Sequence, residues 1–498
     1  DFTGEVYAHT GVLTGSSSGT SDWKYVKTDW GENTADTKLS RVSANVYSLE
    51  ISPTIRDYYG VPAGETITHM AFVFRSADAS LEGKDDGGKD IFVEVFEEGL
   101  NVSISLPDRN KVVDQGTNVA FEAAASETAT LTLYLNNAEV KSLSGTSLTH
   151  TFNFAGSGDN WIRITATTAE ESSADSVFVH ALGTQVSEPV PATARDGINE
   201  VDDQTVTLVL YAPGKERVFV IGDFNDWTPR SDARMKQDGD RFWITLDGLT
   251  PGKEYAFQYL IDEDLYIADP YTDKVLDPGN DRFISEATYP GLKPYPYEYA
   301  TGIVSVFQTA QDPYVWQTTD FTAPPKENLV IYELLVRDFL AAHNWKTLTD
   351  TLDYLDNLGV NAIELMPFNE FEGNESWGYN PSFYFAPDKF YGPKNDLKAF
   401  IDSCHARGIA VIMDMVLNHS YSQSPLVQMY FDAGTGKVTE ENPWYNVESP
   451  NQTYSWGYDF DHDSQATRDF VDSVNGYWMT EYGIDGYRFD FTKGFTNT

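Results

Sequence analysis

The sequence predicts a multidomain chain, in which N-terminal β-sandwich domains precede the first half of a (β/α)8 TIM barrel. Two observations support this order. Short alternating strands with Gly, Asn and Asp turns fill the first 315 residues, and strand-like runs then alternate with helices. A length of 498 residues suits three or four domains. We place the domains at 1–100, 101–182, 201–315 and 316–498, with a linker at 183–200.

Residues 1–100 are expected to form a β-sandwich with several aromatic side chains. Tyr7, Trp23, Tyr25 and Trp30 lie in its first part. These rings are either exposed on the surface or part of a packed core, and the two alternatives are equally supported. The aromatic content alone does not choose between the two.

Residues 101–182 are expected to form an immunoglobulin-like β-sandwich that acts as a spacer. The runs 131–135 and 161–165 alternate apolar and polar residues, which is typical of half-buried strands. No residues with an evident chemical role occur there. The linker that follows contains Pro189 and Pro191 and is expected to be semi-rigid.

Residues 201–315 predict another β-sandwich. Apolar, aromatic-rich strands are expected at 205–211, 218–222, 242–246 and 255–262, separated by turn residues. Trp227 and Trp243 lie in this region, either exposed or in the core of the sandwich. Burial is the more frequent outcome for tryptophans in a sandwich.

Residues 316–498 show the pattern of a parallel sheet. Each predicted helix is followed by a glycine, Gly359, Gly408 or Gly483, and then by a strand. This alternation predicts βαβ units, and four strands would supply half of a barrel. The expected strands are 329–336, 360–367, 409–414 and 484–491, and the expected helices are 347–358, 394–407 and 470–482.

The last predicted strand carries Arg488 and Asp490 two residues apart. In a strand both side chains point to one face, while Tyr487 and Phe489 point to the other. In a parallel barrel the charged ends of the strands hold the reactive groups and the apolar backs pack on helices. Arg488 and Asp490 are therefore candidate catalytic residues.

Three ordered segments resemble motifs of the α-amylase superfamily, glycoside hydrolase family 13. They are Asp414-Met415-Val416-Leu417-Asn418-His419, Gly486-Tyr487-Arg488-Phe489-Asp490, and Trp377-Gly378-Tyr379-Asn380-Pro381. The resemblance covers about the last 180 residues and implies a retaining glycosidase.

By position, the resemblance implies that Asp490 is the nucleophile and that Arg488 keeps it ionised. Asp414 would brace Arg488, His419 would hydrogen-bond the sugar, and Tyr379 would stack on it. The chemistry is consistent, because a guanidinium cannot lose its charge and lowers the pKa of a neighbouring carboxylate.

The resemblance implies two further roles. Lys493 would contact substrate, and Asn418 would correspond to a calcium ligand. Gly494 stands where many members have a histidine whose backbone carbonyl binds the ion, which weakens the expectation of calcium.

A retaining glycosidase also needs a carboxylic acid about 5 Å from the nucleophile to protonate the leaving oxygen. The family places this glutamate after a fifth strand, beyond Thr498, and Glu364 and Glu370 do not occupy its position. We therefore expect a portion of a longer enzyme. A truncated, non-catalytic protein is the alternative.

The module at 201–315 contains Gly-Asp-Phe-Asn-Asp-Trp and Ala-Asp-Pro-Tyr, which resemble carbohydrate-binding family 48. The resemblance implies that Trp227 binds glucan or that the module is only structural. Residues 1–100 are similar to starch-binding β-sandwiches of bacterial amylases, which would assign sugar contacts to Tyr7, Trp23, Tyr25 and Trp30.

A net charge of −42 argues against nucleic acid and anionic membrane surfaces as partners. A neutral α-glucan polysaccharide is not repelled. The single cysteine, Cys404, excludes a disulfide framework, and no apolar run is long enough to span a membrane. The series of β-modules suggests a secreted, periplasmic or cell-surface protein.

Three functions remain. The favoured one is a retaining α-glucan hydrolase, similar to amylases or pullulanases, that acts on starch, glycogen or related glucans. The second is a transglycosylase such as a branching enzyme, which would share Asp490. The third is a non-catalytic glucan-binding surface protein. A general acid downstream of the fourth strand would exclude the third.

Overall fold

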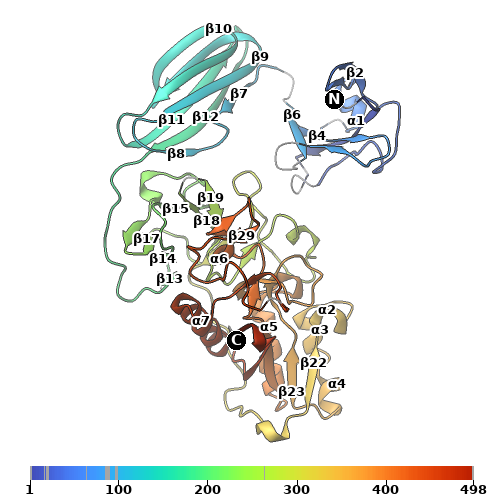
Figure 1. Cartoon of the computed structure of the whole chain (residues 1–498), viewed down its shortest axis with the longest axis vertical. Helices are drawn as coiled ribbons and strands as arrows, with labels where there is room; N and C mark the ends of the chain where they lie inside the picture. Colours follow the sequence, from blue (N-terminus) through green and yellow to red (C-terminus); the bar gives the residue numbers. More distant parts are fainter. Residues whose placement is uncertain are drawn as a thin grey trace. The chain divides into compact units, whose positions relative to one another are not determined.

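The computed structural model describes residues 3–15, 17, 22–62, 64–84, 90–95, 99–262, 264–451 and 453–495. Within these ranges, no helix combines the length and apolar character needed to cross a membrane. The chain divides into two compact units (Figure 1). The first comprises Asp1–Arg109, Asn118–Asn153 and Asn160–Phe178, and the second Asn110–Thr117, Phe154–Asp159 and Val179–Thr498.

The first unit starts with an antiparallel sheet built on β4, Ile67–Ser76. Strand β1, Val6–Thr14, pairs along almost all of β4 and contributes the buried residues Ala8 and Val12. The remaining elements are β2, Ser40–Ser43; β3, Val46–Ser48; α1, Ile55–Tyr59; β5, Glu82–Gly83; and β6, Ile91–Glu94.

Backbone pairing joins the next six strands into one sheet, through the long strand β9, Asn118–Leu135. Alternate residues of β9 are buried over most of its length, as expected for half-buried strands. The other strands are β7, Val102–Leu106; β8, Lys111–Val113; β10, Ala138–Asn153; β11, Gly158–Thr167; and β12, Ser172–Ala181.

Two sheets form the β-sandwich at the start of the second unit. The first has the order β13-β14-β17-β16, and the second β15-β18-β21-β20 with β19 on β18. Leu208 and Phe242 from one sheet and Val220 and Phe257 from the other share a core. The strands are β13, Gly197–Asp202; β14, Thr205–Tyr211; β15, Val218–Gly222; β16, Lys236–Asp238; β17, Arg241–Leu246; β18, Glu254–Ile261; β19, Leu265–Ile267; β20, Val275–Leu276; and β21, Val304–Gln308. Short 3-10 helices lie at Ser231–Ala233 and Asp281–Phe283.

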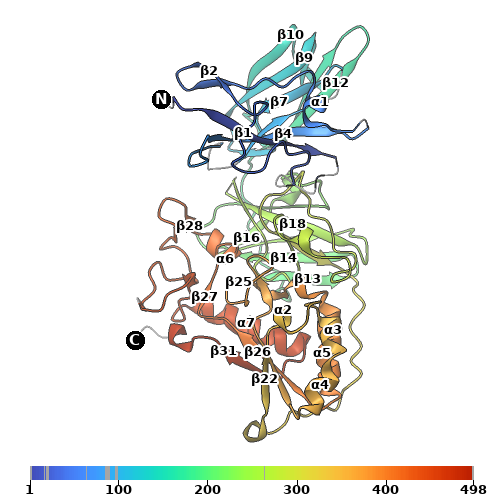
Figure 2. The same ribbon diagram turned by 90° about the vertical axis from the view of Figure 1, so that its right-hand side faces the viewer.

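A parallel sheet with the order β22-β23-β26-β31 follows. Helices α3, α4 and α5 lie together beside it (Figure 2). The positive φ angles of Gly359, Gly408 and Gly483, between 68° and 84°, agree with the predicted helix ends. Continuation of this sheet into a barrel remains a prediction. The strands are β22, Ile331–Leu334; β23, Ala362–Leu365; β26, Ala410–Met415; and β31, Gly486–Phe489, and the helices are α2, Val336–Phe339; α3, Trp345–Thr349; α4, Leu352–Asn357; α5, Lys394–His405; α6, Pro425–Gln428; and α7, Gln465–Glu481.

The helix predicted over 347–358 is interrupted between α3 and α4. The Thr349 hydroxyl donates to the carbonyl of Trp345 at 2.8 Å, and the Thr351 hydroxyl to that of Leu348 at 2.7 Å. Threonine hydroxyls that bond to preceding carbonyls compete with regular helix hydrogen bonds. The prediction of one continuous helix was therefore wrong at residues 350 and 351.

Between the sheet strands, an antiparallel hairpin follows β23. It pairs β24, Asn369–Phe371, with β25, Pro381–Pro387, and ends in a 3-10 helix at Lys389–Tyr391. A second small pairing joins β27, His419–Ser420, to β30, Tyr458–Asp459. A third joins β28, Phe431–Asp432, to β29, Lys437–Val438. The 3-10 helices Lys326–Asn328 and Thr492–Phe495 complete this part.

Candidate active site

Asp414 and Arg488 lie beside each other on adjacent strands. β26 and β31 are parallel, and their register pairs Asp414 with Arg488. Residues that are paired across parallel strands point to the same face of the sheet, so the two side chains meet near the carboxyl ends of the strands. Asp490 follows β31 directly, on the same face as Arg488.

The Arg488 guanidinium contacts two carboxylates. Its Nη1 donates to Asp414 at 3.0 and 3.1 Å and to Asp490 Oδ1 at 2.6 Å. Asp414 is fully buried, whereas the side chains of Arg488 and Asp490 are 41% and 19% exposed. Both carboxylates raise the pKa of Arg488 against the effect of burial, so the cation stays charged beside Asp490.

Tyr379 connects the hairpin to this charged group. Its hydroxyl donates to Asp414 Oδ2 at 2.6 Å. The preceding residue, Gly378, has a φ of +89°, and a Cβ there would overlap the carbonyl oxygen of Pro367. Only glycine fits this turn, which therefore fixes how Tyr379 enters the site.

His419 holds the same turn from the other side. Its Nε2 lies 2.9 Å from the Tyr379 carbonyl oxygen, and since a carbonyl can only accept, Nε2 carries the proton. Burial lowers the pKa of His419, so the ring is neutral near pH 7. Nδ1 is then the ring nitrogen left to accept a hydrogen bond.

Two glutamates that sequence reasoning did not assign lie beside Asp414. Carboxylate oxygens of Glu333, Glu364 and Asp414 all lie within 4.8 Å of one another. Burial, and then the charge of Glu333, raises the pKa of Glu364. Burial also raises the pKa of Asp414 to about 6, although Tyr379 and Arg488 oppose the shift. Both glutamates lie within strands that the sequence predicts, and the parallel register of these strands places Glu333 beside Glu364.

Asn418 is the residue expected to bind calcium. It is 2% exposed, and neither its Oδ1 nor its Nδ2 has a hydrogen-bond partner among the described residues. A Cβ at Gly494 would lie 2.7 Å from Asn418 Cβ, so a histidine does not fit there in this conformation. Calcium takes six to eight oxygen ligands, and the buried, unpartnered Asn418 Oδ1 would supply one of them. Calcium binding at Asn418 therefore stays a prediction.

Two further predicted residues, Lys493 and Trp227, make contacts with other side chains. The Lys493 ammonium lies 5.6 Å from the Tyr454 ring centroid. Trp227 is 6% exposed, packs with Tyr295 and donates from Nε1 to Asp223 at 3.2 Å. Its ring offers no open face to a sugar in this structure.

The two tryptophans of the first unit are placed differently. Trp30 is 47% exposed, and its ring lies edge-on to His9 at 5.2 Å. The Trp23 ring stacks on the same histidine at 5.6 Å. Tyr7, by contrast, is buried. His9, Trp23 and Trp30 therefore form an aromatic group with one open ring.

Two family profiles match the chain. Residues 341–456 match the alpha amylase catalytic domain, and residues 195–272 match carbohydrate-binding module 48, the isoamylase N-terminal domain. The first match includes Tyr379, Asp414 and His419 but ends before Arg488 and Asp490.

Relatives with curated names agree. A 1,4-alpha-glucan branching enzyme of Cupriavidus pinatubonensis is 30% identical over 305 residues, which are 58% of this chain and 38% of the relative. A malto-oligosyltrehalose trehalohydrolase of Saccharolobus solfataricus is 26% identical over 58% of this chain and 45% of its own length. The chain thus covers less than half of either relative.

Among solved structures, the Group B Streptococcus pullulanase is similar, with a TM-score of 0.46, 18% identity, and coverage of 78% of this chain and 54% of that chain. The two profile matches and the curated relatives point to the same family. Residues 195–272 of this chain are similar to carbohydrate-binding module 48, and residues 341–456 are similar to the alpha amylase catalytic domain.

Proposed function

We propose that this chain is part of a retaining α-glucan hydrolase in which Asp490 is the nucleophile. The observation that carries the proposal is Arg488, whose Nη1 contacts Asp490 and the fully buried Asp414 at once. A nucleophilic carboxylate must stay ionised in a partly dry site, and a fixed guanidinium provides that.

In this mechanism Asp490 attacks the anomeric carbon and forms a glycosyl ester, while the leaving oxygen takes a proton from a second carboxylic acid. We assign no described residue to that acid. Tyr379 presents its ring to the sugar, and the neutral His419 accepts from a sugar hydroxyl through Nδ1. Asp414 holds Arg488 and Tyr379 in place.

Labelling of the nucleophile tests the proposal. The protein at its full encoded length is incubated with a fluorinated glycosyl fluoride, which slows hydrolysis of the ester, and is then digested for mass spectrometry. We expect the sugar on the peptide that contains Asp490, and we expect Asp490→Asn to lower kcat by roughly four orders of magnitude. A label on another carboxylate would overturn the assignment.

A second candidate is glucan transfer, as in a branching enzyme, and a third is glucan binding without catalysis. Similarity to the branching enzyme of Cupriavidus pinatubonensis favours transfer. The two reactions differ in whether water or a sugar hydroxyl opens the ester. Reducing ends released from amylose indicate hydrolysis, whereas new branch points without reducing ends indicate transfer. Binding without either product would indicate the third function.

We also propose that the protein is secreted, periplasmic or displayed on the cell surface.

We further propose that Trp23 and Trp30 bind α-glucan. The exposed ring of Trp30 supports this proposal. Trp30→Ala is expected to weaken retention of the chain in a gel that contains soluble starch. Trp161→Ala is the matched control, because Trp161 is similarly exposed, at 45%, on another sheet. Equal losses would contradict a specific site.

A further inference from the structure

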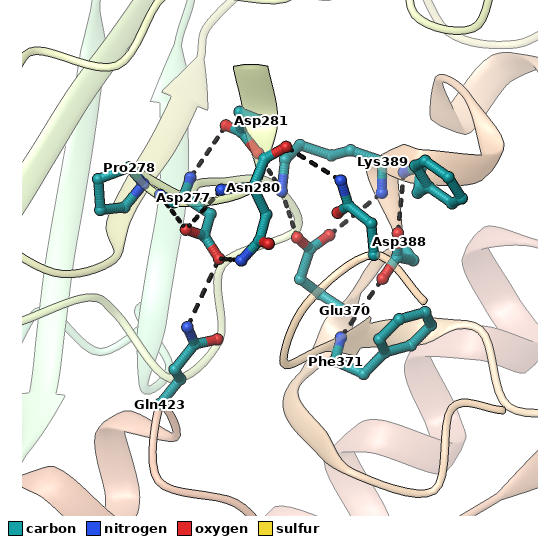
Figure 3. A network of polar contacts seen from close by, with 12 residues as sticks. Asp277, Pro278, Asn280, Asp281, Glu370, Phe371, Asp388, Lys389 and Gln423 are labelled. Carbon is teal, nitrogen blue, oxygen red and sulfur yellow. Dashed lines mark hydrogen bonds and ion pairs between the residues drawn. The ribbon is translucent and has the colours of Figure 1, made fainter. Parts of the chain in front are cut away.

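A buried charge network lies away from the candidate active site, around Lys389 (Figure 3). The Lys389 ammonium contacts Glu370 Oε1 and lies 3.3 Å from Asp281 Oδ1. The Lys389 side chain is only 3% exposed, and those of Glu370 and Asp281 are 10% and 9% exposed. Asp388 is also buried, and its Oδ1 accepts from the backbone amide of Phe390 at 2.8 Å.

The network joins two parts of the chain that are far apart in sequence. Asp281 lies between β20 and β21 and so belongs to the β-sandwich module. Glu370 lies in β24, and Asp388 and Lys389 directly follow β25. Lys389, which follows β25, therefore contacts Asp281 of the module and Glu370 of β24.

More contacts connect the same module turn to the hairpin and its neighbour. The Asn374 side chain, in the connection between β24 and β25, donates to the Asn280 carbonyl at 3.0 Å. The Gln423 side chain approaches Asp277 at 3.5 Å, and Asp281 accepts from the Asp277 amide at 2.9 Å (Figure 3). The turn is thus fixed on one side by its own bonds and on the other by the catalytic domain.

The connection that is held in this way carries Tyr379. It runs from residue 372 to 380, between the two strands that Lys389 holds together. At its other end, Tyr379 bonds to Asp414 through its hydroxyl and to His419 through its carbonyl. A shift at the base of the hairpin would therefore reach the candidate active site through a short covalent path.

The charges in the network do not balance, since three carboxyl groups surround one ammonium. Burial, and then the charge of Glu370, raises the pKa of Asp388 although Lys389 opposes the shift, and burial raises the pKa of Glu370 to about 7. Burial alone would lower the pKa of Lys389, but Asp281, Glu370 and Asp388 outweigh it and raise the value. Lys389 therefore stays charged, and the surplus carboxyl groups tend to hold a proton.

We propose that Lys389 is a positioning residue, which locks the hairpin to Asp281 of the module and so sets the position of Tyr379 in the active site. The catalytic part of this inference rests on the proposed function. It gives the module a role that needs no sugar, in agreement with the burial of Trp227.

Asp281→Asn is the variant that tests the lock most cleanly. The amide oxygen can still accept from the Asp277 amide, and the change removes the negative charge of the module that faces the Lys389 ammonium. Asp273→Asn is the matched control. Asp273 also joins the module to the catalytic domain, through Lys394 Nζ at 2.7 Å, but at the start of α5 rather than at the hairpin.

The first readout needs no activity. Hydrogen–deuterium exchange of this chain is followed over residues 372–380. Asp281→Asn is expected to speed exchange there at least tenfold, and Asp273→Asn is expected to leave it within twofold of the wild type. Unchanged exchange in Asp281→Asn would overturn the lock whether or not the protein proves to be an enzyme.

The second readout is a double-mutant cycle in the full-length enzyme. Asp281→Asn is expected to lower kcat/KM about tenfold in the wild-type background and less than twofold in the Tyr379→Ala background, because a misplaced ring no longer matters once it is removed. Equal losses in both backgrounds would show that the network only supports folding. If Tyr379→Ala lowers activity but its effect and that of Asp281→Asn are simply additive, positioning through Tyr379 is refuted.

Discussion

Two charge clusters in the second unit combine one cation with more than one carboxylate, yet they differ in exposure. The Arg488 side chain is 41% exposed above the fully buried Asp414, whereas the Lys389 side chain is 3% exposed among Glu370, Asp281 and Asp388. A charge that water or a substrate can reach is available for chemistry. A charge enclosed by protein has a structural effect, because its loss leaves buried partners uncompensated.

The difference in exposure predicts that loss of Lys389 destabilises the fold more than loss of Arg488. Lys389→Met is expected to lower the free energy of unfolding by about 3–5 kcal/mol, because it leaves buried carboxyl groups without their cation. Arg488→Met should cost clearly less, since water can reach the vacated position. Urea denaturation of the chain measures both values.

Lys437→Met provides the surface control for this pair of variants. The Lys437 side chain is 45% exposed and pairs with the exposed Glu448, so its loss should cost at most about 1 kcal/mol. If Arg488→Met destabilised the chain as much as Lys389→Met, the distinction between an open and a buried cluster would fail.

The buried cluster should also make stability depend on pH. The pKa of Glu370 rises from 4.5 to about 7 on folding, so the folded state holds its proton more tightly than the unfolded state. Stability from this group is fully present below pH 4.5 and is lost as pH rises towards 7. At 1.36 kcal/mol per unit, the loss is about 3 kcal/mol.

Glu370→Gln isolates this contribution, because an amide does not titrate. Urea midpoints at pH 4.5 and 7.5 should differ less in Glu370→Gln than in the wild type. Groups outside the network titrate in the same range and cancel in the comparison, whereas the pKa of Asp388 is itself raised by Glu370 and changes with it. Parallel pH profiles for the two proteins would show that Glu370 is ionised throughout and that another carboxyl group carries the proton.

The open cluster should respond to geometry more than to charge. Arg488→Lys keeps the positive charge, but a single ammonium cannot reproduce a planar guanidinium that contacts Asp414 and Asp490 together. We expect kcat of the full-length enzyme to fall roughly 100-fold, or about 2.7 kcal/mol. Arg468→Lys, on the surface of α7, serves as the control. Full activity in Arg488→Lys would mean that charge alone suffices.

Sequence patterns predicted the open cluster, because Arg488 and Asp490 are only two residues apart at the end of one strand. Strand periodicity places Arg488 and Asp490 on one face, and the family resemblance implied that Asp414 contacts Arg488. The parallel register of β26 and β31 brings the two strands together. The glycines that end the helices were visible for the same reason, since a left-handed residue at that position is a local requirement.

The buried cluster could not be predicted in this way. Asp281 and Lys389 are separated by more than a hundred residues, and no periodicity relates a module turn to the end of a hairpin. Glu370 was visible only as a loop carboxylate unsuited to the role of general acid. The burial of Trp227 has a similar cause, because Tyr295 and Ala300, which pack with it, come from a distant segment.

The ion pair between Asp273 and Lys394 provides an intermediate case and the smallest predicted effect. It joins the same two parts of the chain as Asp281 and Lys389, at 2.7 Å, but its side chains are 29% and 28% exposed. Asp273→Asn should therefore lower the free energy of unfolding by less than about 1 kcal/mol, since water replaces most of the lost interaction. Urea denaturation next to Lys389→Met measures the contrast. A loss near 3 kcal/mol would mean that docking of the module, rather than burial of charge, determines the cost of breaking these pairs.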